Sequence, residues 1–100
     1  MVAALLLDEP EPGRLHISGE IDTHTAPALA DRLGVFGPDT HLEIDLTDTT
    51  FISSAGLSTL LAAAERLEGG GGSLRIAGVS ETVERLIELS GLADRFPLGD

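Results

Sequence analysis

The segment Phe51-Ile52-Ser53-Ser54-Ala55-Gly56-Leu57-Ser58-Thr59-Leu60-Leu61 leads from a buried strand and its loop into an amphipathic helix. The two serines stand where that helix would begin. No thiol, lysine or second catalytic group accompanies them. A hydroxyl at the positive end of a helix can accept a phosphate, because the amide groups there also stabilise the added anion. The segment therefore indicates a regulatory switch rather than an enzyme.

Length and composition predict a single domain that spans residues 1–100. One hundred residues have too little apolar surface for two cores, and the hydrophobic fraction of 42% is ordinary for one. The chain has no Cys, which excludes disulfides and cysteine metal sites and fits a cytoplasmic setting. No apolar run approaches the length of a membrane span, so we expect no membrane insertion.

The charge balance is strongly acidic, with a formal net charge of −11 and no Lys. Such a chain repels phosphate backbones and anionic lipid, so nucleic acid is not an expected partner. A protein with a basic face is the expected partner. The three histidines are scattered and match no ligand spacing, so we expect no metal site. We also expect no cofactor and no catalytic residue.

Hydrophobic periodicity and turn residues predict an α/β fold with about five strands and three helices. Strands are expected at 2–7, 14–21, 41–46, 73–77 and 93–98. Helices are expected at 28–36, with the helix start in residues 22–27, and at 54–68 and 80–90. Residues 8–13, 47–52 and 69–72 are expected to be turns or loops, with Gly69–Gly72 as a flexible linker. Leu89 is expected to face inward from the third helix. Helical crossovers imply a mixed, mostly parallel sheet, with the first strand added as a hairpin.

The candidate site lies where the carboxyl ends of strands meet helix starts. Parallel sheets gather ligand and partner sites at this edge. Asp22-Thr23-His24 follows one strand, and Ser53-Ser54 precedes the second helix. We therefore expect these two segments to lie at one edge of the sheet.

With this pattern in place, the chain resembles the STAS domain family of anti-sigma factor antagonists over nearly its whole length. Two stretches carry the resemblance: GEIDTHTAP at residues 19–27 and FISSAGL at residues 51–57. The first is similar to the family's stretch before its first helix, and the second to its phosphorylation loop. The resemblance implies the STAS fold.

The resemblance also implies a function. Ser54 would be phosphorylated by an anti-sigma factor that is itself a serine kinase, a histidine-kinase-like ATPase, and a protein phosphatase would reverse the change. The unmodified protein would bind that kinase and free a sigma factor. The partner surface implied in this way comprises Asp22, Thr23, His24, Ser53, Ser54, Gly56, Leu57 and Ser58.

Two departures from the family pattern matter. The family usually has Asp immediately before its acceptor serine, whereas this chain has Ser53, which is therefore a rival acceptor. The family usually ends with a fourth helix, and this chain stops at Asp100. The C-terminal helix is thus expected to be missing, which would expose an apolar face for a homodimer.

Other interpretations of the same residues remain open. Ser53 or Ser54 would serve equally as a helix cap, Asp22 as the cap of the first helix, and Gly56 as a site of close packing. A non-phosphorylated STAS subunit of a lipid transporter or stress-signalling complex is the alternative function. A hydrolase that uses Ser54, His24 and Asp22 is a weaker one, because Ile52 replaces the glycine that a nucleophile elbow requires.

Overall fold

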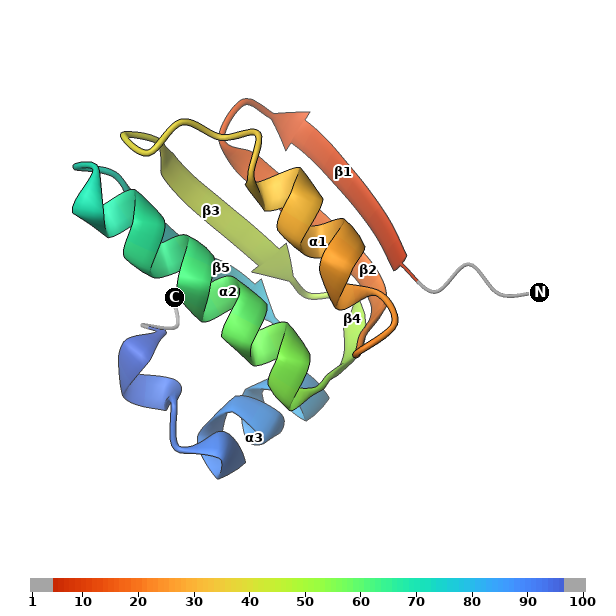
Figure 1. Ribbon diagram of the computed structural model, residues 1–100. Coiled ribbons are helices and arrows are strands. Elements are labelled where there is room, and N and C mark those ends of the chain that lie inside the picture. Colours follow the sequence, from red (N-terminus) through yellow and green to blue (C-terminus); the bar gives the residue numbers. More distant parts are fainter. Residues whose placement is uncertain (1–4, 97–100) are drawn as a thin grey trace.

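The computed structural model describes residues 5–96 and has a five-stranded mixed sheet with three α-helices (Figure 1). The strands are β1 (Leu5–Glu11), β2 (Arg14–Ile21), β3 (His41–Leu46), β4 (Thr49–Ile52) and β5 (Ser73–Val79). The helices are α1 (Ala26–Leu33), α2 (Ser54–Gly69) and α3 (Glu81–Ser90), and Ala93–Arg95 forms one turn of 3-10 helix. The predicted α/β class is confirmed.

Strand β2 organises the sheet, whose order is β1-β2-β3-β5. Strand β1 pairs with β2 antiparallel, and the other pairings are parallel. Strand β3 pairs with the first half of β2, from Arg14 to His16, and β4 pairs with its last residues, from Gly19 to Ile21. Strands β3 and β4 therefore follow each other along one edge of β2, and the carboxyl ends of β2 and β4 lie together.

The core lies between the sheet and helices α1 and α2, which cover one face of it (Figure 1). Alternate residues of the strands point into this layer, among them Leu15, Ile17 and Ile44, all fully buried. Each such side chain contributes about 1.5–3 kcal/mol on burial. The opposite face is polar, and there Glu43 of β3 accepts from Arg14 of β2 at 3.3 Å and pairs with an arginine of β5.

Two of the predicted strand assignments are wrong. Residues 49–52, expected in a loop, form β4, where Thr49 is buried and its hydroxyl donates to the Ile17 carbonyl at 2.8 Å. The burial of its four residues does not alternate, since Thr49 and Ile52 are buried and the two residues between them are exposed at a register shift against β2. The expected strand at 93–98 is instead a 3-10 turn followed by buried Phe96, whereas Pro97 and Leu98 lie outside the described residues.

The first hairpin differs from the prediction in its length. Strand β1 continues to Glu11, through residues expected to form a turn, and the turn itself is Pro12–Gly13. Pro10 is tolerated because β1 is an edge strand with one neighbour, so its missing N–H need not break a ladder bond. Residues 2–4 of the predicted strand lie outside the described residues.

Two smaller predictions about the helices also fail. Helix α1 begins at Ala26 and ends at Leu33, whereas the prediction extended it to Phe36. Leu89 is 77% exposed, although the prediction placed it in the core. It follows the buried Ile87 by two positions, a rotation of about 200° around the helix, and so lies on the opposite side.

The Gly69–Gly72 segment is more than a flexible linker. Gly70 and Gly72 lie against the loop from Pro38 to Thr40, and a Cβ on either glycine would overlap that loop. Ser73 then donates to the Thr40 carbonyl at 2.9 Å as β5 begins. Close backbone approach, rather than flexibility, therefore requires two of these glycines.

Candidate functional site

The two segments expected at one sheet edge lie side by side in the structure. Ile21 and Ile52 are register partners at the ends of β2 and β4. The Ser53 amide continues this pairing and donates to the Ile21 carbonyl at 2.8 Å. The turn that begins at Asp22 and the start of α2 are therefore held together by a backbone hydrogen bond.

Ser53 is the N-cap of α2. Its backbone is extended, with φ −92° and ψ 174°, and its side-chain Oγ accepts from the Gly56 amide at 3.2 Å. Its carbonyl accepts from the Leu57 amide at 2.9 Å. The half-buried Ser53 hydroxyl is thus occupied in satisfying an amide that would otherwise lack a partner.

Ser54 has a different environment. It is the first residue of the 16-residue helix α2 and is exposed. Within the part of the chain that the structure describes, its hydroxyl has no hydrogen-bond partner, and the first turn of α2 contains no acidic residue. An anion on this hydroxyl would meet the positive end of the helix dipole without an acidic neighbour in that turn.

Replacing Ser53 with Ala is expected to lower the free energy of unfolding by about 1 kcal/mol, because the Gly56 amide loses its acceptor. The matched control is Ser54→Ala, which removes a hydroxyl without a partner and should leave stability almost unchanged. Urea unfolding followed by circular dichroism measures both. Equal losses in the two variants would contradict the assignment of Ser53 as the cap.

Asp22 organises the turn before α1. Its Oδ1 accepts from the amides of His24 at 2.9 Å and Thr25 at 3.0 Å. The Thr25 hydroxyl in turn accepts from the Asp22 amide at 2.9 Å. The Thr25 amide, followed by the Thr25 hydroxyl and the His24 amide, lowers the pKa of the Asp22 carboxyl below its ordinary value. A negative charge is therefore fixed beside the start of α2.

Thr25 is a site residue that the sequence analysis missed. It stands immediately before α1, where its side chain caps no amide of that helix, and its hydroxyl also donates to the Glu20 carbonyl at 2.8 Å. The available signal was the spacing of Asp22 and Thr25, since residues three apart at a helix start often exchange side-chain and backbone hydrogen bonds. Asp22 and Thr25 therefore fix the turn before α1 together, and neither side chain caps an amide of α1 itself.

The remaining predicted partner-surface residues divide by burial. Thr23, His24 and Ser58 are exposed, whereas Gly56 is buried and Leu57 is only 4% exposed. A Cβ on Gly56 would lie 2.6 Å from Ile21 Cγ2 and 2.8 Å from Ile52 Cγ1. The close-packing interpretation of Gly56 is confirmed. Gly56 and Leu57 therefore present little exposed surface in the described structure.

The hydrolase arrangement of Ser54, His24 and Asp22 is not assembled. Asp22 accepts from the backbone amide of His24, and among residues 5–96 no hydrogen bond links its carboxylate to the imidazole ring.

Over the same residues, no three His, Asp or Glu side chains group closely enough to hold a metal ion. None of the described helices is long and apolar enough to cross a membrane.

The sequence matches one protein family, and curated proteins named as anti-sigma factor antagonists are similar to it. Residues 8–100 match the STAS domain family. The chain is 33% identical over 82 residues to the anti-sigma-B factor antagonist of Bacillus subtilis (strain 168), which covers 81% of this chain and 75% of that protein. The protein of the same name from Listeria monocytogenes is 34% identical over 82 residues, covering 80% and 72%.

A solved structure agrees with these sequence matches. The crystal structure of an anti-sigma factor antagonist from Mycobacterium paratuberculosis is 34% identical, with a TM-score of 0.75. The match covers 96% of this chain and 84% of that one. From the family match, the sequence identities and the shared architecture, we conclude that the chain belongs to the STAS domain family.

Proposed function

We propose that this protein is an anti-sigma factor antagonist, a regulatory binding protein rather than an enzyme. In its unmodified form it binds an anti-sigma factor that is a serine kinase and thereby frees a sigma factor. Phosphorylation of Ser54 blocks that binding, and a protein phosphatase restores it. The names of the relatives support the antagonist role. The observation that carries the phosphorylation proposal is the exposed, unbonded hydroxyl of Ser54 at the start of α2.

The choice between the two serines follows from their hydrogen bonds. Phosphorylating Ser53 would require its Oγ to leave the Gly56 amide and would place a bulky anion in a half-buried position. Phosphorylating Ser54 breaks no hydrogen bond among the described residues. A kinase reaches Ser54 at a lower cost in stability, so Ser54 is the proposed acceptor and Ser53 its supporting cap.

The turn beside Ser54 suits basic groups of a partner, whereas the Ser54 hydroxyl itself would face an acidic group of that partner. The ionised Asp22 lies on the neighbouring turn and is followed by the exposed residues Thr23 and His24. Ser58 is also exposed and lies about one helical turn after Ser54. The net charge of −11 speeds association with a basic surface. This surface, centred on Ser54, is the proposed kinase-binding site.

Phosphate mapping tests the proposal. The purified protein is incubated with candidate serine kinases of the anti-sigma type and ATP, and the tryptic peptide that contains both serines is fragmented in a mass spectrometer. The modification is expected on Ser54, retained in Ser53→Ala and lost in Ser54→Ala. Modification of Ser53 alone, or of neither serine by the cognate kinase, would contradict the proposal.

Co-purification separates this function from the transporter-subunit alternative. We expect tagged protein from the native host to recover a histidine-kinase-like ATPase. Recovery of a transporter ATPase in its place would support the alternative, in which Ser54 is never modified. The two outcomes involve partners of different size and sequence, so they are readily distinguished.

A further inference from the structure

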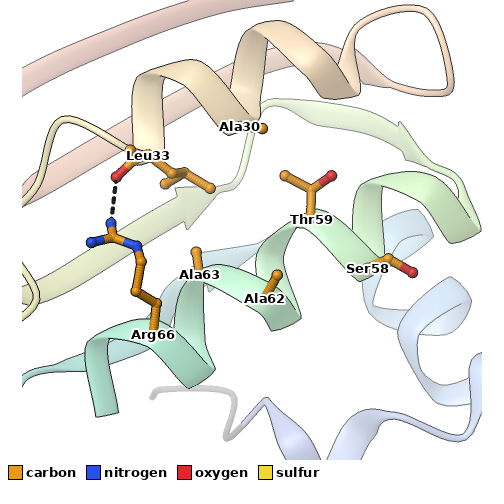
Figure 2. A pocket seen from close by; sticks show the side chains of 8 residues that line it. Ala30, Leu33, Ser58, Thr59, Ala62, Ala63 and Arg66 are labelled. Atoms are coloured by element: carbon orange, nitrogen blue, oxygen red, sulfur yellow. Dashed lines mark hydrogen bonds between the residues drawn. The ribbon is translucent and has the colours of Figure 1, made fainter. Parts of the chain in front are cut away.

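A groove of about 370 Å³ lies between α1 and α2 (Figure 2). It is lined by Ala30, Leu33, Gly34, Ser58, Thr59, Ala62, Ala63 and Arg66. Its volume is at the lower end of the range that small-molecule sites occupy, about 300–1,000 Å³. The groove exists because the facing residues of the two helices are small and leave space between the helix backbones.

The lining of the groove is apolar along its length and polar at its ends. Leu33 and the alanines supply hydrocarbon surface. Ser58 and Thr59 lie toward one end along α2, and Arg66 lies toward the other (Figure 2). Since Arg66 alone in the lining carries a charge, this arrangement matches a ligand with a hydrocarbon body and an anionic group at one end.

Arg66 supplies a positive charge at one end of the groove. Its Nη2 donates to the Leu33 carbonyl at 3.0 Å, which holds the guanidinium across the groove from α2 to α1 (Figure 2). Four of the six arginines pair with carboxylates, but Arg66 has no carboxylate partner among residues 5–96. A guanidinium has five N–H donors, so most remain available for an anion.

We propose that this groove binds a small amphiphile: an aliphatic chain that ends in a carboxylate. The chain would lie along the alanines, and the carboxylate would accept hydrogen bonds from Arg66. Between Ser58 and Arg66 the helix rises about 12 Å, which accommodates about eight to ten carbon atoms in extended form. The strongly negative protein would otherwise repel such an anion, so binding depends on the local positive charge.

Two probe molecules of equal chain length test the role of Arg66. Octanoate and octanol are titrated separately into the isotopically labelled protein, and amide shifts are followed by NMR. We expect saturable shifts at the groove residues with both probes and tighter binding of octanoate. In Arg66→Met, which keeps an unbranched apolar side chain, octanoate affinity should fall about three- to tenfold while octanol affinity stays the same.

The matched control is Arg85→Met. Arg85 is exposed on α3, lies outside the groove and also lacks a carboxylate partner within residues 5–96. Removing its charge should leave octanoate binding unchanged. An equal loss in both arginine variants would show that net charge, not the groove, attracts the ligand, and would overturn the proposal.

Filling the groove tests the site itself. Ala62 is exposed on α2, where Leu is a good helix former, so Ala62→Leu is expected to fold normally. This substitution should lower the affinity for octanoate and for octanol by at least about tenfold. Circular dichroism verifies folding of each variant. Unsaturable shifts, shifts outside the groove, or unchanged affinity in a folded Ala62→Leu protein would each overturn the proposal.

Discussion

Phosphate on Ser54 is expected to weaken binding of the anti-sigma factor kinase by about a thousandfold. If an acidic group of the partner lies near 4 Å, each added unit of charge costs about 4 kcal/mol at a surface-like dielectric. That energy corresponds to about three powers of ten in the dissociation constant. Calorimetric titration of the kinase with the unmodified and phosphorylated proteins measures the difference.

Three substitutions at Ser54 separate charge from bulk. Ser54→Ala should bind constitutively, and Ser54→Asp should bind more weakly. Ser54→Asn has the size of Asp without its charge and should resemble Ala if charge dominates. The helix dipole stabilises an anion at this position by about 0.3–1 kcal/mol, so the Asp variant should remain folded. Equal affinities of the Ser54→Ala and Ser54→Asp proteins for the kinase would contradict the proposal that a negative charge at Ser54 blocks binding.

Replacing Gly72 with Ala is expected to destabilise the fold by about 2–3 kcal/mol, the upper part of the range for overpacking. The added Cβ would overlap the Thr40 carbonyl oxygen and press on the carbonyl carbons of Asp39 and Thr40 at 2.8 Å. These are backbone atoms, and the Thr40 carbonyl also accepts a hydrogen bond from the amide of Ser73, the first residue of β5. The loop therefore cannot shift without breaking this hydrogen bond. Thermal unfolding should show a midpoint lower by about 10 °C or more.

Gly69→Ala is the matched control for this prediction. Gly69 is the last residue of α2, and no atom lies within 4 Å of a Cβ placed on it. Alanine favours the helix by up to about 1 kcal/mol relative to glycine, so this variant should be as stable as the parent or slightly more stable. If both variants lost stability equally, contact with the Pro38–Thr40 loop would not explain the requirement for Gly72.

Much of the fold was predictable because helices and long strands leave a local periodic pattern. The alternation of Leu42, Ile44 and Leu46 predicted β3, and the stripe from Leu57 to Leu67 predicted α2. The four residues of β4 were missed because their burial does not alternate where the register against β2 shifts. The error at Leu89 arose from counting apolar residues near a helix end without following their angle around its axis.

The candidate site was predictable in position but not in detail. A parallel sheet places Asp22 and Ser53 at one edge, and that follows from the order of elements alone. Which serine caps α2 depends on side-chain rotamers and on the Gly56 amide, and adjacent serines look alike in a sequence. The role of Thr25 in fixing Asp22 depends in the same way on hydrogen bonds within the folded turn.

The order of the main elements and their buried faces were thus predictable from the sequence, because the spacing of apolar residues within each helix or strand indicates which of its faces is buried. Contacts between distant residues are different, because no local pattern records them. The Ser53 amide meets Ile21, Gly72 meets Thr40, and Arg66 meets Leu33 only after the sheet and helices have packed. These contacts decide which hydroxyl is free, which glycines are required and where a groove remains.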